Sequence, residues 1–124
     1  MTNIQSTNKF NLEDRTLDFA KSIIKICQIL PNNIVNNKLV DQMIRSAGSV
    51  GANYREANDS LGNKDFVLRL RISRKEAKET IFWLQLVQQA NPTLSLQIVK
   101  LIDECTQIRN ILSSIIIKIT RKNA

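Results

Sequence analysis

The residues best suited to chemistry are basic side chains between positions 64 and 78, which could contact phosphate groups. They are Lys64, Arg71, Arg74, Lys75 and Lys78. At 100° per residue these positions fall within an arc of roughly 100° on a helix, so they predict one basic ridge. Lys and Arg on such a ridge can straddle the phosphates of a nucleic-acid backbone.

The ridge predicts binding by charge, with little readout of base sequence. Lys75 lies one turn before Glu79, and the two can pair and so reduce the positive excess slightly. Phe82 lies near the ridge, but the sequence contains no pattern typical of an RNA-stacking platform. The alternative is a charged helix face that is simply solvated, and both interpretations stay open at this stage.

A second polar group lies between positions 42 and 56. On a helical wheel its members share one flank, with two small residues beside them: Gln42, Arg45, Ser49, Asn53 and Glu56, next to Gly48 and Ala52. Glycine inside a helix costs about 1 kcal/mol relative to alanine, so Gly48 and Gly51 predict the close approach of another helix. We therefore interpret the group as a packed polar seam against another helix or subunit, where Arg45 and Glu56 satisfy one another or a neighbour's groups. A solvated outer face is the alternative.

The residues expected of an enzyme are missing from the sequence. It has no histidine, and its two cysteines, Cys27 and Cys105, are too far apart in the chain for a C-x-x-C metal motif. Residues 48–51, GSVG, lie within a helical pattern and follow no strand, so they form neither a phosphate-binding loop nor a nucleophile elbow. Glu76 and Glu79 are interpreted as salt-bridge partners. We expect no enzymatic activity, no metal and no cofactor.

Composition predicts one basic, helical domain. The 124 residues include 18 Lys and Arg against 11 Asp and Glu, a net charge of +7 that makes anionic partners worth considering. Aromatic residues are only 5% of the chain, and three Gly and two Pro are too few to punctuate many hairpins. The sequence contains no stretch of about 20 apolar residues, so it predicts no membrane span. Residues 1–11 lack a signal pattern, so a cytoplasmic location without membrane association is the simplest expectation.

The elements that must position these residues are four helices, predicted at residues 12–30, 36–58, 64–90 and 94–120. Pro31 ends the first helix, and Asn91-Pro92-Thr93 separates the last two, with Thr93 as a candidate N-cap. Residues 1–11 are expected to be a flexible arm and residues 121–124 a basic tail. Short connections between long helices favour an all-α, antiparallel, up-down-up-down four-helix bundle.

Apolar side chains recur on each predicted helix at bundle spacing. Examples are Phe19, Ile23 and Ile26 in the first helix, and Ile98, Leu101, Cys105, Ile108, Leu112, Ile115 and Ile119 in the last. In the third helix other apolar residues project away from the main stripe: Leu68, Ile72, Trp83 and Leu86. A helix that is apolar on several sides predicts a neighbouring subunit. Arg109 falls on the last stripe, where burial would require an acidic partner.

A longer pattern resembles a known family. Residues 42–57, QMIRSAGSVGANYREA, match the signature of the four helix bundle proteins, also called 23S rRNA intervening sequence proteins. The likeness continues in the third predicted helix at Asp65-Phe66, Leu70, Lys75-Glu76-Ala77, Glu79-Thr80 and Trp83-Leu84. Polar positions match as well as apolar ones, and the likeness covers nearly the whole chain.

The resemblance implies architecture more than activity. The resemblance implies an antiparallel bundle that assembles into a ring, commonly a pentamer. Some members of the family are encoded within insertions in bacterial 23S rRNA genes. The accessory protein of diversity-generating retroelements is similar, and it binds nucleic acid and a reverse transcriptase. A homo-oligomer, RNA or DNA, and a protein partner such as a reverse transcriptase are therefore expectations for this chain.

Two hypotheses follow. In the first, a non-catalytic homo-oligomeric bundle binds RNA or DNA non-specifically through the basic ridge, and multivalency strengthens weak single contacts. In the second, the chain is an assembly or scaffold module for another protein and has no nucleic-acid role. The apolar residues outside the core stripe of the third helix motivate the second hypothesis.

Overall fold

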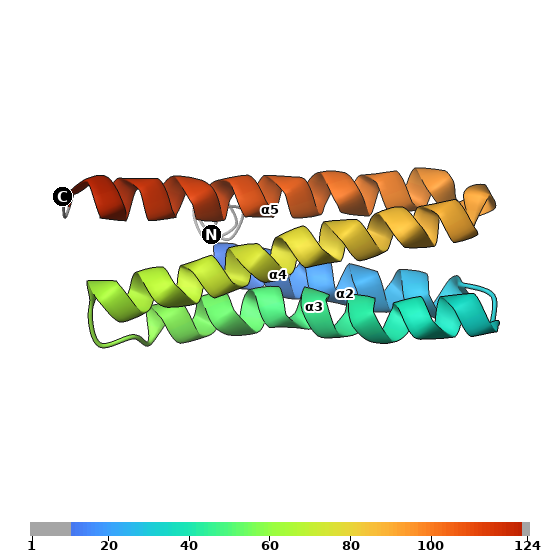
Figure 1. Ribbon diagram of the computed structural model, residues 1–124, viewed down its shortest axis with the longest axis horizontal. Helices are drawn as coiled ribbons and strands as arrows, with labels where there is room; N and C mark the ends of the chain where they lie inside the picture. The colour runs from blue at the N-terminus through green and yellow to red at the C-terminus, as the bar shows by residue number, and fades with distance from the viewer. Residues whose placement is uncertain (1–10, 123–124) are drawn as a thin grey trace, which may run out of the picture.

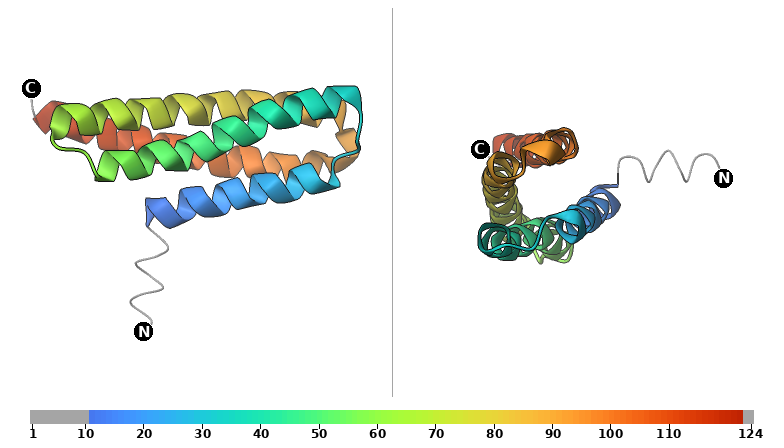
Figure 2. Two further views of the ribbon diagram at one scale, coloured as in Figure 1. Left: turned by 90° about the horizontal axis from the view of Figure 1, so that it is seen from below. Right: turned by 90° about the vertical axis from the view of Figure 1, so that its right-hand side faces the viewer.

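The computed structural model describes residues 11–122, which form four long antiparallel α-helices and one short 3-10 helix (Figure 1). The helices are α2 (Leu12–Ile29), α3 (Ile34–Asn58), α4 (Asn63–Ala90) and α5 (Ser95–Lys122), with the 3-10 helix η1 (Pro92–Leu94) before α5. Figure 2 shows that the four helices follow one another around the bundle in chain order. The predicted up-down-up-down four-helix bundle is confirmed.

Side-chain caps explain where the first two helices begin. Asn11 accepts hydrogen bonds from the backbone amides of Glu13 and Asp14, so it caps α2. Asn33 caps α3 in the same way by accepting from Asn36 N. The cap at Asn33 places the start of α3 at Ile34, two residues before the predicted start.

Two boundaries near the C-terminal half differ from prediction. Thr93 is not an N-cap, because it lies inside η1, where Pro92 starts a 3-10 turn that leads directly into α5. At the other end α5 continues to Lys122, so Arg121 and Lys122 belong to the helix instead of a basic tail. Of the predicted arm, residues 1–10 lie outside the described part of the chain, as do residues 123–124.

The core consists of the predicted apolar stripes. Phe19 and Ile23 of α2, Met43 of α3, Leu84 of α4 and Ile108 of α5 are all 2% exposed or less. Removing a large aliphatic side chain from such a core typically costs about 2–5 kcal/mol of stability. This shared core fixes the rotation of each helix, and with it the residues that face outward.

One end of the bundle is held by a buried pair of asparagines. Asn36 Nδ2 donates to Asn91 Oδ1 at 2.9 Å, and Asn91 Nδ2 donates to Asn36 Oδ1 at 2.8 Å. The second amide hydrogens bond to the carbonyl oxygens of Pro31 and Val87, each at 2.9 Å. This reciprocal pair connects the start of α3 to the end of α4, with every amide donor satisfied.

The two helical glycines have different surroundings. A Cβ on Gly51 would lie 2.9 Å from Thr16 Oγ1, so α2 and α3 approach closely there, as predicted. Gly48 is exposed, and a Cβ at this position would meet nothing within 4 Å. No other helix of the described chain approaches Gly48, so the approach of a helix from another subunit stays a prediction.

Candidate nucleic-acid interface

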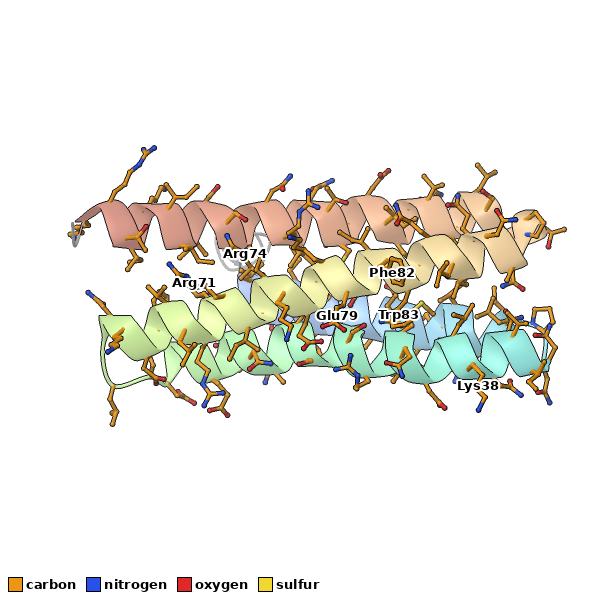
Figure 3. All side chains as sticks on the ribbon, viewed as in Figure 1. Lys38, Arg71, Arg74, Glu79, Phe82 and Trp83 are labelled. Atoms are coloured by element: carbon orange, nitrogen blue, oxygen red, sulfur yellow. The ribbon has the colours of Figure 1, made fainter. Side chains whose placement is uncertain are left out.

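The predicted basic ridge lies on the outer side of α4, toward α5. Arg71, Lys75 and Lys78 are exposed, and Arg74 is half-buried with its Nη1 3.4 Å from Ser113 Oγ of α5. Figure 3 shows Arg71 and Arg74 on the side of α4 that faces α5. The buried stripe of α4 fixes this placement, because it forces the opposite arc of the helix outward.

Four of these cations share one shallow hollow of about 510 Å³ with three other α4 residues. The hollow is lined by Arg71, Arg74, Lys75, Lys78, Glu79, Phe82 and Trp83. We call the four cations Arg71, Arg74, Lys75 and Lys78 the basic surface. Lys64 is not part of this hollow. It lies at the start of α4 beside a second, mostly apolar hollow that also includes Leu68 and Thr120.

The described residues offer little neutralisation of the basic surface from within the chain. The ion pairs found in residues 11–122 involve Arg15, Arg45 and Arg55, and no member of the basic surface lies within 4.0 Å of a carboxylate. Lys75 and Glu79, which the sequence allows to pair, are not in contact at that distance. No ion pair within residues 11–122 therefore neutralises these cations.

Arg109 of α5 lies beside this positive region, whereas the sequence placed it on the apolar stripe of the last helix and not with the basic ridge. It is half-buried, its Nη2 donates to Asn110 Oδ1 at 3.3 Å, and no carboxylate in residues 11–122 pairs with it. Arg109 lies one helical turn from Cys105, which contacts Ala77 O, and one turn from Ser113, which contacts Arg74. It therefore faces the α4–α5 interface, and the expected acidic partner is absent there.

The opposite flank of α4 carries charges that are already paired. Arg45 of α3 extends across to α4, with Nη1 3.3 Å from Glu76 Oε1 and Nη2 3.1 Å from Glu79 Oε1. Glu76 is only 8% exposed, so Arg45 supplies the counter-charge that a nearly buried carboxylate needs. Glu79, although it borders the hollow, is thus partly neutralised.

The other residues of the predicted polar seam do not form one cluster. Asn53 Nδ2 donates to the backbone oxygen and the hydroxyl of Ser49, both at 2.9 Å, within α3 itself. The remaining members are exposed: Gln42, Gly48, Ala52 and Glu56. The guanidinium of Arg45 pairs with carboxylates of α4 and not with Glu56. Arg45 therefore joins α3 to α4, while the four exposed members of the predicted seam face solvent.

An aromatic pair closes one end of the hollow. The ring centroids of Phe82 and Trp83 are 5.2 Å apart, with an interplanar angle of 70°, an edge-to-face arrangement (Figure 3). Phe82 is 53% exposed, whereas Trp83 is half-buried. Trp83 Nε1 is buried without a hydrogen-bond acceptor among the described residues, so packing holds the indole in place.

The remaining reactive groups do not converge. No three His, Cys, Asp or Glu residues within positions 11–122 could hold a metal ion. Burial raises the pKa of the Cys27 thiol to about 11 and that of Cys105 to about 12, so both thiols are protonated at neutral pH. No helix in the described range combines the length and apolarity needed to cross a bilayer.

Comparisons with known proteins place the chain in a family. The family model described as 23S rRNA-intervening sequence protein matches residues 8–114. A crystal structure of a protein of unknown function from Bacteroides thetaiotaomicron, assigned to the S23 ribosomal protein family, is 34% identical with a TM-score of 0.75. That match covers 85% of this chain and 97% of the other. No curated protein matches the chain. The resemblance suggested by the sequence is confirmed, and the chain belongs to the 23S rRNA-intervening sequence protein family.

Proposed function

We propose that this bundle is a non-catalytic protein that binds RNA or DNA through phosphate contacts at the basic surface of α4. The observation that supports this is that these four cations have no ion-pair partner among residues 11–122. Arg71, Arg74, Lys75 and Lys78 share one hollow without an ion pair in residues 11–122, although the chain pairs Arg45 with two carboxylates on the other flank. Cations left free in a group favour a polyanion over a single small anion.

Phosphate binding of this kind depends on salt and carries little sequence information. Each neutralised phosphate releases counter-ions, so affinity falls steeply as salt rises. The family description, 23S rRNA-intervening sequence protein, is compatible with an RNA-linked setting. Binding by charge alone fits such a role without any catalytic group.

Self-association belongs to the same proposal. Apolar side chains remain exposed on α2 and α3 after the core has formed, with Leu17 40%, Ile24 46% and Ile44 41% exposed. The open position at Gly48 would allow another backbone to approach. A ring of copies, pentameric by family resemblance, would multiply the net charge of +7 and join several weak contacts through multivalency.

Binding to a short single-stranded RNA at low salt tests the proposal. The variant Arg71→Gln, Arg74→Gln, Lys75→Gln, Lys78→Gln is compared by fluorescence anisotropy with the wild type. A matched control changes four other exposed lysines to Gln, namely Lys21, Lys25, Lys38 and Lys100. Both variants lose four positive charges, so they separate the position of the charge from its total.

We expect the basic-surface variant to lose affinity by about 100-fold or more, since several phosphate contacts disappear, and the control to lose much less. Equal losses in the two variants would show that net charge alone is responsible and would remove the basic surface from the account. Circular dichroism melting of both variants shows whether the fold is retained.

A protein partner is the second candidate function, and one observation favours it. Leu68 is 54% exposed, and together with Val67 and Thr120 it lines the mostly apolar hollow between the start of α4 and the end of α5. Leu68→Ser should then abolish capture of a protein partner while nucleic-acid affinity stays constant. Assembly without any nucleic-acid binding at low salt would favour this candidate.

A further inference from the structure

Phe82 lies in line with the cations of α4, and Trp83 lies beside it. Phe82 is one helical turn beyond Lys78 and two turns beyond Lys75, on the same outer arc. The distance along the helix from Arg71 to Phe82 is about 16 Å at 1.5 Å per residue. All of these residues line the same hollow, so an extended ligand could contact the ring and the charges together.

The geometry of Phe82 suits stacking. The residue is 53% exposed, and the edge-to-face contact with Trp83 at 5.2 Å limits the ring's rotation. Trp83 is half-buried and so provides a fixed neighbour. An aromatic ring held in this way, beside cations and facing solvent, is the arrangement on which nucleobases stack in single-strand-binding proteins.

The charges around the ring favour a polyanionic ligand over an apolar protein segment. Four cations line the hollow with one carboxylate, Glu79, which is 3.1 Å from Arg45 Nη2 and therefore already paired. A partner with negative charge and exposed ring faces satisfies both parts of this site. In a duplex the base faces are stacked on one another and hidden, whereas in a single strand they are available.

We propose that Phe82 stacks on an unpaired base while the basic surface holds the neighbouring phosphates, so that this site selects single-stranded nucleic acid over duplex. The inference rests on the proposed function and adds the class of nucleic acid to it. Trp83 acts as a positioning residue that orients the Phe82 ring. The two arginines and two lysines supply attraction common to both kinds of strand.

The chain contains its own reporter for this site, because Trp83 is the single tryptophan in the sequence. A 20-nucleotide oligouridine and a 20-base-pair RNA duplex are titrated separately into the wild-type protein, and tryptophan fluorescence is followed. Stacking next to the indole should quench its emission with oligouridine and leave it nearly unchanged with duplex at equal occupancy. Quenching of the same size by both ligands would overturn the inference.

Substitutions at position 82 complete the test. Phe82→Ala should weaken oligouridine binding by about tenfold and leave duplex affinity unchanged, while Phe82→Tyr should retain the wild-type affinity. Phe82→Leu keeps apolar bulk without a ring face, so it should behave like Phe82→Ala. The matched control is Val35→Ala on α3, which truncates an apolar side chain of the same exposure, 53%, outside the hollow and should change neither affinity.

The outcomes separate this inference from the proposed function. Unchanged oligouridine affinity in both Phe82→Ala and Phe82→Leu would reject stacking and leave phosphate binding intact. An equal loss for oligouridine and duplex would also reject it, because charge or local structure would then explain the effect. Absence of binding of either ligand to the wild type at low salt would instead reject the proposed function itself.

Discussion

The two outer flanks of α4 differ in whether their charged side chains are paired. Toward α3, Arg45 pairs with Glu76 at 3.3 Å and with Glu79 at 3.1 Å. Two buried hydrogen bonds also join these helices: Thr80 Oγ1 lies 2.8 Å from Ser46 Oγ, and Ser73 Oγ donates to Val50 O at 2.7 Å. Toward α5, the basic surface has no carboxylate partner among the described residues, and its one polar contact is the 3.4 Å approach of Arg74 to Ser113. The charges of the first flank are paired within the bundle, whereas those of the second have no ion pair within residues 11–122.

Net charge alone does not reveal this division. The excess of +7 could be spread over a solvated surface, but the core stripe of α4 turns four cations toward the same hollow. Desolvation and pairing decide which charges contribute to stability. We therefore expect substitution of Arg45 to change unfolding and substitutions of the basic surface, or of Glu79 beside it, to change binding.

The largest effect on stability is expected at Asn91, which follows the last residue of α4 and bonds to the start of α3. Asn91→Ala removes both bonds to Asn36, a residue only 1% exposed, whose side-chain amide would keep just its bond to Pro31 O. We expect a loss of about 2–3 kcal/mol in the free energy of unfolding, measured in urea. Asn36→Ala with Asn91→Ala should cost less than the sum of the single changes, and strict additivity would contradict a coupled pair.

A smaller effect is expected at Arg45. Arg45→Met leaves the nearly buried Glu76 without its cation, and we expect a loss of about 1 kcal/mol because Arg45 itself is half exposed. Urea unfolding measures it, and Lys38→Met on the same helix is the exposed control. If the Arg45 variant is as stable as the control, the ion pairs of this flank do not hold α3 to α4.

The smallest effect is expected at Glu79, which borders the hollow. Glu79→Gln removes a negative charge beside the basic surface, and RNA affinity at low salt should rise by about two- to threefold. Anisotropy measures the change, and Glu56→Gln on α3, away from the hollow, is the control. A fall in affinity would mean that Glu79 supports the binding site and does not oppose it.

Most of the fold could be predicted from the sequence because apolar periodicity and the Pro and Asn breaks determine it. Residues such as Phe19, Met43 and Leu84 lie where the periodic stripes predict. In α5 the heptad pattern pointed to Ile115, which is half-buried against the core, while the neighbouring Ile116 is more fully buried, at 4% exposure. An α-helix with 3.6 residues per turn drifts about 20° per heptad, so a strict seven-residue pattern loses register late in the helix.

Only part of the candidate site could be predicted from the sequence. The helical wheel placed five cations on one arc, and four of them line the same hollow, because only the geometry of α4 is involved. Lys64 lies beside the other hollow, two turns before Arg71. It could not assign Glu76 and Glu79 to Arg45 or place Arg109 toward α4, because both facts depend on how neighbouring helices rotate and pair. The contact between Phe82 and Trp83 depends on side-chain rotamers, which no wheel contains.

The dependence of RNA affinity on salt tests the central claim most directly. The slope of log K against log salt concentration is measured for the wild type, for the four-Gln variant of the basic surface and for Arg45→Gln. At about 0.7 per single-strand contact, losing four contacts should reduce the slope by about 3 in the four-Gln variant and by nearly nothing in Arg45→Gln. Equal slopes for all three proteins would contradict the division between the two flanks of α4.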